Sequence, residues 1–548
     1  MARFHTFGGV IAVIAGLIPN LAAAQGTGPG DSCKALLSPD NRAAFETIRH
    51  APTNILSAVV VPAGGDQSIV QRDLPEYCRV EGMIAPTVGF LLRMPTKTWN
   101  GKFMMGGCGG PCGNYLEDRI DPALVRNYAV VTTDMGHKGG SRMYGYNNLP
   151  NLIDDGFRST HVTAVAAKVI IAAHYGRKAE FNYYMGCSTG GRQGLQEAQR
   201  FPFDFDGIIA GAPPHAQINF QPLIDEWVGR NNVDADGKLI LTKDKLPLIH
   251  NAVLAACDEI DGLKDGVLQH PPACKWQPSE LLCKGRARAD CLTAAQVEVA
   301  EKAYRGATWS DGSPMFYGQS GRARGTELKW ASNLEPSTGR GVNSSLKYMD
   351  VFAAPGPEFA DAAFDIDRDV PESQATEMFY YHRNPDLRQF KAAGGKLILF
   401  NGWDDDCCRA DATIEYYEMV TRLMGGPERT MDFARLFLPA GMDHCRYGIG
   451  GGEVDWITAL ENWVEKGQAP EQVIAHHMIE EPYPSVPRHI TDYGSPYTRM
   501  ARHPLPPESY DRAHPVYPYP DWPRYAGQGD PADPANWRRV TGEWRGPE

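Results

Sequence analysis

The sequence lacks the features that would direct it to nucleic acid or into a bilayer. It carries 54 Lys and Arg against 66 Asp and Glu, with a formal net charge of −12, and its basic side chains form no stripe along the chain. Binding to the phosphate backbone of a nucleic acid depends on clustered Lys and Arg side chains. Beyond the N-terminus, no apolar run approaches the roughly 20 residues that span a bilayer. We find no internal repeat, and we expect neither a nucleic-acid nor a membrane partner.

Residues 1–24 have the pattern of a secretory signal peptide. Arg3 precedes an apolar run over residues 8–18, which ends at Pro19, and alanines at 22–24 supply a small-residue cleavage site. A membrane anchor is the weaker alternative because the run is too short. We therefore expect a secreted or periplasmic protein whose twelve cysteines form disulfides, as is the default in an oxidising compartment.

The central part of the sequence predicts an interrupted α/β domain. Short apolar runs alternate with helical stretches in two blocks, and runs that are apolar on both faces indicate parallel strands covered by helices. We expect residues 25–214 and 383–548 to form one core, and residues 215–382 to form a lid domain inserted over the strand ends. The tail from Arg502 onward is rich in Pro and aromatics and predicts an ordered extended strap, with a disordered tail as the alternative.

One serine stands between glycines in Gly186-Cys187-Ser188-Thr189-Gly190, which matches the nucleophile elbow of α/β-hydrolases. There, a sharp turn from strand to helix exposes the serine hydroxyl, and larger side chains in place of the glycines would collide. The pattern alone is weak in a chain with 57 glycines, but "FNYYM" precedes it as a strand and "GRQGLQEAQRF" follows as a helix. We expect Ser188 to be a catalytic nucleophile.

A nucleophilic serine needs a base to take its proton and a carboxylate to orient that base. In this fold the acid and then the histidine follow the serine, each after a late strand. His444 follows the apolar run "RLFLPAGMD", whereas Asp404, Asp405 and Asp406 follow "LILFNGW". Of the fifteen histidines, only His444 both comes after the serine and the acid in the chain and directly follows a predicted strand. We therefore expect His444 to be the base and not a structural histidine. The residues alone leave all three aspartates open.

Two cysteines flank the predicted nucleophile and base. Cys187 directly precedes Ser188, and Cys445 directly follows His444. A disulfide would hold their Cα atoms about 5.5 Å apart and place the serine beside the histidine. The sequence alone does not dictate the pairing.

Together, "GCSTGGRQG", "GW-x-D" and "DHC" resemble the tannase and feruloyl esterase family, and "YCRVEG", "TDMGH", "CDEIDGLKDGV" and the tail extend the resemblance over essentially the whole mature chain. The resemblance implies an α/β-hydrolase fold with a large lid. It implies that Ser188 is the nucleophile, His444 the base and Asp405 the orienting acid. It also implies the disulfides Cys187–Cys445, Cys33–Cys78 and Cys283–Cys291.

The oxyanion of an acyl-transfer reaction needs preorganised N–H donors. We expect one donor from Thr189, which follows the nucleophile at a helix N-terminus. The second is expected from Gly109 in "GGCGG", where glycines let the backbone approach a substrate closely. An ordinary glycine turn is the alternative for Gly109.

Four cysteines depart from the family pattern: Cys108, Cys112, Cys407 and Cys408. The first two lie on the expected oxyanion loop and the last two on the acid loop. They could form Cys108–Cys112 and a strained Cys407–Cys408 ring, or they could link the two loops directly. We expect these four cysteines to form additional disulfides around the site, and we favour this over a redox role. The tail also lacks the cysteine pair that many relatives carry.

The segment "CDEIDGLKDGVLQHPPAC" places Asp258, Asp261 and Asp265 on a loop that contains two glycines. Clustered carboxylates on a loop suit a hard cation, and calcium accepts mixed carboxylate and carbonyl ligands. The spacing is not that of an EF-hand, because Gln269 stands where the twelfth position requires glutamate. A solvated acidic loop is the alternative to a metal site.

The family resemblance implies a structural calcium at this loop. The carbonyls of Leu263 and Val267 would complete the ligand set, and a bond between Cys257 and Cys274 would close the loop and stabilise it by roughly 3 kcal/mol. The loop is far from Ser188 along the chain, so its metal is expected to stabilise the fold and not to catalyse.

These expectations combine into a secreted serine esterase that cleaves small esters of aromatic acids, such as ferulate or gallate esters, through an acyl-enzyme on Ser188. Terephthalate monoesters, or other aryl or alkyl esters, are the alternative substrates. A peptide- or lipid-cleaving hydrolase would share the triad and differ in the lid. A non-catalytic binding protein of the same fold is the alternative of a different class.

Overall fold

The computed structural model describes residues 29–64, 74–140, 142–215, 220–315, 321–332, 334–335, 378–478 and 510–544, together with the positions 365, 367, 368 and 371. The predicted signal peptide lies outside the described residues, as does the beginning of the tail. No helix within the described ranges combines the length and the apolar character needed to cross a membrane.

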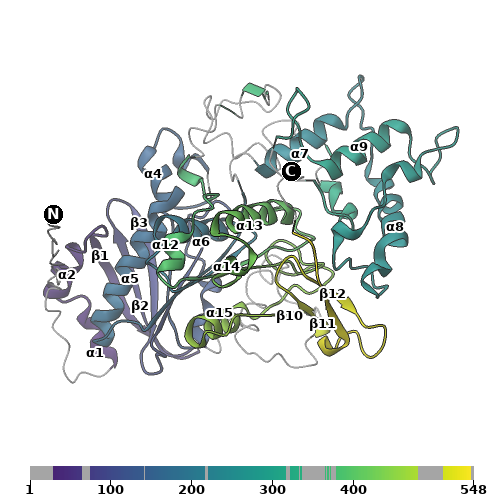
Figure 1. The fold of residues 1–548 in the computed structure, drawn as a ribbon. Coiled ribbons are helices and arrows are strands. Elements are labelled where there is room, and N and C mark those ends of the chain that lie inside the picture. The colour runs from purple at the N-terminus through teal and green to yellow at the C-terminus, as the bar shows by residue number, and fades with distance from the viewer. Residues whose placement is uncertain are drawn as a thin grey trace, which may run out of the picture.

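A nine-stranded sheet forms the centre of the molecule, with the strand order β1-β2-β3-β5-β4-β6-β7-β8-β9 (Figure 1). The strands are β1 (Thr53–Val61), β2 (Tyr77–Ile84), β3 (Val88–Pro95), β4 (Lys102–Gly106), β5 (Ala129–Thr133), β6 (Phe181–Cys187), β7 (Gly207–Gly211), β8 (Lys396–Phe400) and β9 (Ala434–Phe437). From β5 to β9 all neighbouring strands are parallel, whereas β1, β2, β3 and β5 pair antiparallel. The parallel strands therefore end at one edge, where the loops after β6, β8 and β9 come together.

Both faces of the sheet are buried, as the doubly apolar strands predict. Along β8, Leu397 and Leu399 join one hydrophobic cluster, and Ile398 and Phe400 join another, because successive side chains point to opposite faces. Helices α5 (Ser159–Tyr175) and α6 (Thr189–Arg200) pack into the first cluster, and α15 (Trp456–Lys466) packs into the second. This layered arrangement confirms the predicted α/β-hydrolase fold.

The chain between β7 and β8 adds no described strand to the sheet and instead forms a helical insertion. Its elements include α7 (Phe220–Asn231), α8 (Leu246–Cys257), α9 (Ala294–Arg305) and the short 3₁₀ segment η8 (Glu327–Ser332). They bury a cluster of their own that contains Ile249, Val253 and Trp330. Figure 1 shows α7, α8 and α9 at the end of the molecule away from α1 (Pro29–Ala35) and α2 (Pro39–Glu46).

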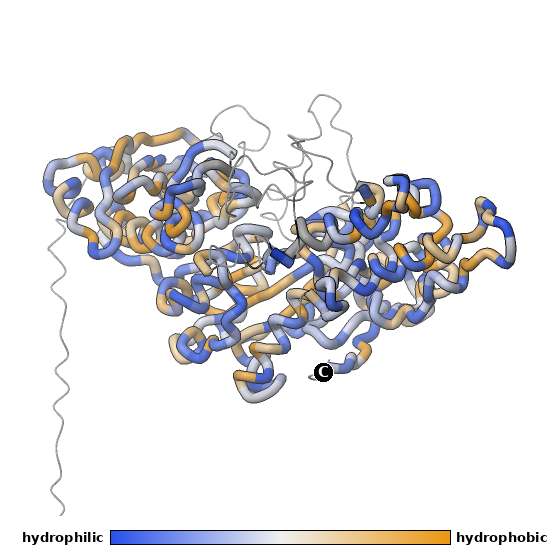
Figure 2. The backbone as a smooth tube through the Cα atoms, turned by 90° about the horizontal axis from the view of Figure 1, so that it is seen from above, coloured by the Kyte–Doolittle hydropathy of each residue, from blue (hydrophilic) through white to orange (hydrophobic). Residues whose placement is uncertain are grey.

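The insertion and the core are amphipathic in the same way. In Figure 2, short hydrophobic and hydrophilic segments alternate along the tube in both regions, as expected of elements with one buried and one exposed face. The predicted limits of the insertion, residues 215 and 382, both fall outside helices and strands.

The C-terminal tail is extended over its described part, and much of it is paired. Strand β11 (Tyr510–Val516) pairs with β10 (Val473–Met478), and β12 (Trp522–Tyr525) pairs with β13 (Trp537–Val540). Between them, the amide of Tyr519 donates to Leu436 of β9 at 2.8 Å, and its hydroxyl donates to Glu418 at 2.6 Å. The strap thus covers β9, the last strand of the sheet, and protects an edge that could otherwise pair with another chain.

Candidate active site

Ser188 sits on the sharp turn between β6 and α6. Its backbone has φ 62° and ψ −126°, a strained conformation for a residue with a Cβ. The flanking glycines are required by space: a Cβ on Gly186 would lie 2.5 Å from the carbonyl oxygen of Gly190, and one on Gly190 would lie 2.9 Å from that of Cys108. The predicted nucleophile elbow is therefore present in the structure.

The loops after β8 and β9 bring a carboxylate and an imidazole together. Nδ1 of His444 lies 2.9 Å from Oδ2 of Asp405, and the amides of Cys407 and Cys408 donate to Oδ1 of Asp405 at 2.8 and 2.7 Å. The side chain of Asp405 is fully buried, whereas that of His444 is 28% exposed. Of the three aspartates that the sequence left open, the structure therefore joins Asp405 to the histidine.

Backbone contacts hold these two loops against each other. The amide of Asp404 donates to the carbonyl of Met442 at 3.2 Å, and a Cβ on Gly402 would come within 2.1 Å of that same oxygen. The glycine of the "GW-x-D" segment is therefore needed for the close approach. Sequence reasoning had found the segment without this physical reason.

A disulfide joins Cys187 to Cys445, with the Cα atoms 5.9 Å apart. It fastens the elbow to the histidine loop through the residues that are next in sequence to Ser188 and His444. The described contacts include no hydrogen bond between the Ser188 hydroxyl and His444, and such bonds often tighten only in the substrate complex. The structure also contains the predicted disulfides Cys33–Cys78, Cys257–Cys274 and Cys283–Cys291.

The expected oxyanion donors lie on two segments that contact each other. Thr189 begins α6, and its hydroxyl donates to the carbonyl of Gly110 at 2.8 Å. The amide of Gly107 donates to Met185 and that of Cys108 to the side chain of Gln193, so neither is available to a substrate. Within the segment Gly107–Gly110, the amides of Gly109 and Gly110 have no hydrogen-bond acceptor in the described part of the chain. The role of Gly109 stays a prediction.

Gln193 is a positioning residue that sequence reasoning missed. Its side-chain oxygen accepts from the Cys108 amide and from the Tyr184 hydroxyl, both at 3.1 Å, and the whole residue is buried. It thereby fixes the oxyanion loop to α6. The signal was present in the "GGRQG" segment, because a polar residue in the first turns of a buried helix needs partners.

Lys329 of η8 connects the insertion to the loops that carry Asp405 and His444. Its ammonium group donates to the Asp404 carbonyl at 2.8 Å and to the carboxylate of Asp443, and it lies 3.7 Å from the Asp404 carboxylate. Burial raises the pKa of Asp404 to about 6, and the cation of Lys329 opposes that rise. Asp404 and Asp443 directly precede Asp405 and His444, so the lysine bears on the position of this hydrogen-bonded pair.

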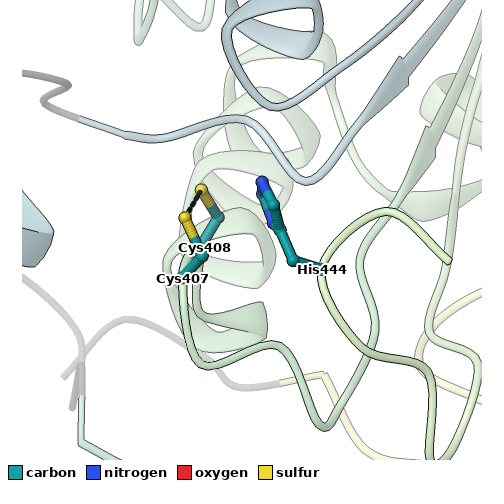
Figure 3. A group of neighbouring side chains, drawn as sticks. All are labelled: Cys407, Cys408 and His444. Atoms are coloured by element: carbon teal, nitrogen blue, oxygen red, sulfur yellow. Dashed lines mark hydrogen bonds between the residues drawn. The ribbon is translucent and has the colours of Figure 1, made fainter. Parts of the chain in front are cut away.

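The two cysteines of the acid loop are free thiols. Their Sγ atoms are 3.6 Å apart, so neither the predicted Cys407–Cys408 ring nor a link between the loops is formed. Cys108 and Cys112 instead bond to each other, which was one of the expected pairings. Figure 3 shows the two side chains beside His444, with a hydrogen bond between their sulfur atoms. A disulfide between adjacent residues would require a distorted backbone ring. The loop backbone instead donates the amides of Cys407 and Cys408 to Asp405.

The electrostatics of the histidine follow from these neighbours. Burial disfavours its charged form, but Asp405 and Cys407 outweigh burial and hold the pKa of His444 well above its usual value. The hydrogen bond from Cys408 is the main cause that lowers the pKa of the Cys407 thiol to about 6. Burial opposes this shift, and the positive charge of the His444 ring adds to it. A carboxylate that stabilises an imidazolium is what a proton-shuttling base requires.

The predicted calcium loop gathers its carboxylates at the end of α8. Asp258 accepts from the Gly266 amide at 3.0 Å, Asp261 from the amides of Leu263 and Gln269, and Asp265 from that of Val267. Burial raises the pKa of Asp261 to about 7, and repulsion by its two carboxylate neighbours adds to this. Asp258 and Asp261 are buried, and Asp265 is half-buried with Arg512 at 3.7 Å from its carboxylate. A loop of clustered carboxylates fits a hard cation with oxygen ligands.

Comparisons with known proteins agree with this geometry. A family model described as tannase and feruloyl esterase matches residues 69–540. The chain is 33% identical to a mono(2-hydroxyethyl) terephthalate hydrolase of Piscinibacter sakaiensis, over 84% of each protein. It is 31% identical to a probable feruloyl esterase B-2 of Aspergillus flavus, over 84% of this chain and 92% of that protein.

Solved structures share the fold. The crystal structure of feruloyl esterase B from Aspergillus oryzae superposes with a TM-score of 0.76 at 24% identity, covering 93% of this chain and 100% of that one. A tannin acyl hydrolase from Aspergillus niger gives a TM-score of 0.69 at 20% identity, covering 94% and 95%. With a family model that spans most of its length, the chain belongs to the tannase and feruloyl esterase family of carboxylic ester hydrolases.

Proposed function

We propose that this protein is a secreted serine esterase that hydrolyses small esters of aromatic acids through an acyl-enzyme on Ser188. The observation that carries the proposal is the hydrogen bond between His444 and Asp405, on loops fastened to the serine elbow by Cys187–Cys445. The five disulfides of the described chain support secretion, because such bonds persist in oxidising compartments.

The reaction follows from the arrangement of these groups. The Ser188 hydroxyl attacks the ester carbonyl while Nε2 of His444 takes its proton, and Asp405 holds the imidazole through Nδ1. The Thr189 amide and a glycine amide of the oxyanion loop stabilise the tetrahedral oxyanion, each contributing about 3 kcal/mol. His444 then protonates the departing alcohol, and a water molecule activated by the same imidazole releases the acid from the serine.

The substrate class rests on the relatives. Those with assigned names are described as feruloyl esterases and as a terephthalate monoester hydrolase, and each name refers to an ester of an aromatic acid. A site between the core and the insertion suits such small esters, since Lys329 of the insertion reaches the loops that carry Asp405 and His444. A terephthalate monoester is the second candidate, supported by the relative from Piscinibacter sakaiensis.

A substrate panel tests the proposal. Methyl ferulate, methyl gallate, mono(2-hydroxyethyl) terephthalate and a plain short-chain ester are compared by kcat/KM, beside Ser188→Ala. Ser279→Ala, which changes an exposed serine of the insertion, is the matched control. We expect an aromatic ester to exceed the plain ester and Ser188→Ala to abolish its turnover. Equal rates for all four esters would refute the substrate class, and an active Ser188→Ala would refute the mechanism.

We also propose that the loop of Asp258, Asp261 and Asp265 holds a structural calcium, with carbonyls of Leu263 and Val267 among its ligands. Two buried carboxylates and the half-buried Asp265 support this, because a divalent cation would remove the repulsion that raises the pKa of Asp261. The ion would fix the insertion and would take no part in the chemistry at Ser188. The Cys257–Cys274 disulfide closes the same loop.

A further inference from the structure

Cys407, Cys408 and His444 form a cluster of potential metal ligands inside the catalytic site. One ligand atom from each, the two sulfurs and a ring nitrogen, lies within 4.8 Å of the others (Figure 3). Cys408 is 2% exposed, while Cys407 and His444 are half-buried, so the cluster is open on one side. Neither thiol is consumed by a disulfide.

The spacing of the sulfurs matches a tetrahedral metal centre. Bonds of about 2.3 Å from zinc to two thiolates separate the sulfurs by roughly 3.8 Å, and the observed separation is 3.6 Å. The ring nitrogen needs to approach the sulfurs to about 3.5 Å, which rotation of the half-buried side chains can provide. Three protein ligands leave a fourth position for water.

The loop backbone orients these ligands. Asp405 accepts the amides of Cys407 and Cys408 through one oxygen and binds Nδ1 of His444 through the other. The carboxylate therefore lies behind the histidine as an outer partner, an arrangement that orients metal-binding histidines generally. With Nδ1 bound to Asp405, Nε2 of the neutral ring carries the available lone pair.

The surrounding charge also favours a cation. Asp404, Asp406 and Asp443 lie on the same two loops, and Lys329 forms ion pairs with Asp404 and Asp443. Hard cations prefer oxygen ligands, whereas thiolate and imidazole select zinc and softer ions. The donor set therefore discriminates against calcium and magnesium.

We propose that Cys407, Cys408 and Nε2 of His444 form an inhibitory site for Zn²⁺ or a similar thiophilic cation. Binding requires a free lone pair on Nε2 and two thiolates, so the metal displaces whatever protons these three atoms carry and occupies the nitrogen that must receive the proton of Ser188. Metal binding and catalysis thus exclude each other. This inhibition rests on the proposed esterase function, whereas metal binding itself does not.

Two measurements on the full-length protein test the site separately. Co²⁺ is added to the protein after its free thiols have been counted, and thiolate-to-metal charge transfer is followed by absorption. Zn²⁺ is then added to the esterase assay, with Ca²⁺ and Mg²⁺ as hard-cation controls and with rates expressed relative to each variant's own metal-free rate. The variants are Cys407→Ser, Cys408→Ser and the double replacement, and His477→Ala is the control for zinc on a surface histidine.

We expect a cobalt–thiolate band, reversible inhibition by Zn²⁺, and a rise of the inhibition constant by at least roughly tenfold in each serine variant, the loss that even an outer partner of a ligand causes. His477→Ala should behave as the unmodified protein. A missing band, a band that survives the double replacement, or thiols already oxidised to a Cys407–Cys408 disulfide would overturn the site. A normal band in a protein inert toward every ester would instead reject the proposed function and retain the metal site.

Discussion

Replacing Lys329 with methionine is expected to slow turnover and to weaken the fold by a modest amount. The side chain is similar in length, but the ammonium group that contacts Asp404 and Asp443 is lost. A hydrogen bond to a charged partner contributes about 1.5–3 kcal/mol. The carboxylate of Asp443 is 42% exposed, so its pairing with the lysine is screened by water and contributes little. The loss should therefore come mainly from Asp404, at about 1–3 kcal/mol of unfolding free energy.

The effect on catalysis should be larger than this stability loss suggests. Asp404 and Asp443 are adjacent to Asp405 and His444, and a shift of about 1 Å in a catalytic group can cost roughly 100-fold. We expect kcat to fall roughly 10- to 100-fold with a small change in KM. Circular dichroism and the Cys187–Cys445 bond should be unchanged, since η8 is anchored by Trp330.

The stability loss should also depend on pH with a defined sign. The pKa of Asp404 is raised to about 6 although Lys329 opposes the rise, so removing the lysine raises it further. A raised carboxyl pKa makes the folded state bind more protons than the unfolded state, and stability then falls as pH rises through it. The difference between Lys329→Met and the unmodified protein should therefore be greater at about pH 8 than at about pH 5.

Two matched variants make the result interpretable. Lys329→Arg keeps the positive charge and should retain more activity than the methionine variant. Lys245→Met removes another insertion lysine, whose ammonium group binds backbone carbonyls of residues 288, 289 and 291 within the insertion. Steady-state kinetics and urea unfolding are measured for all three. If Lys329→Met keeps kcat within about twofold, or if Lys245→Met lowers it equally, the proposed link from lid to triad is refuted.

Three further predictions concern the rest of the molecule. Cys187→Ala with Cys445→Ala should lower kcat more than Tm; equal losses in both would mean that the bond is only structural. A calcium chelator should lower Tm without changing kcat below that temperature, and Asp261→Asn should remove the sensitivity; an unchanged Tm in the unmodified protein would reject the calcium site. Burial lowers the pKa of His174 to about 4 and of His382 to about 3. The unfolded state therefore binds protons first as pH falls below about 6.5, and unfolding free energy should drop by roughly 2 kcal/mol per histidine at about pH 5. Urea titrations of the double glutamine variant should show a flatter pH dependence, and an identical slope would contradict the assignment.

The positions of the serine and the histidine in the fold could be predicted from the sequence, because each follows a strand in a known chain order. Ser188 follows a strand and begins a helix, and His444 follows a later strand, so their places at one sheet edge follow from parallel topology. The residues alone left Asp405 open among three aspartates, because its neighbours differ by one residue on a loop, and the family resemblance was needed to choose it. Only the folded backbone shows which carboxylate receives the amides of Cys407 and Cys408.

Other features depend on contacts that no local pattern encodes. Lys329 lies 75 positions before Asp404, in an insertion whose packing on the core is not visible as periodicity. Whether Cys407 and Cys408 form a disulfide depends on whether the backbone of two adjacent residues can close a ring. Hydrogen bonding to Asp405 holds that backbone in a different conformation, and both thiols stay free. The tail was predicted to be extended, but its pairing beside β9 arises from the tertiary position of Tyr519.

The bond between Cys187 and Cys445 spans 258 positions and therefore encloses the whole insertion in a covalent loop. A protease that cuts a peptide bond anywhere between them leaves both fragments attached through the sulfurs. The nicked molecule would migrate as one species without reductant and as two with it, while Ser188 and His444 remain tethered. The protein would thus tolerate proteolytic cleavage of its insertion without separating the loop of Ser188 from the loop of His444.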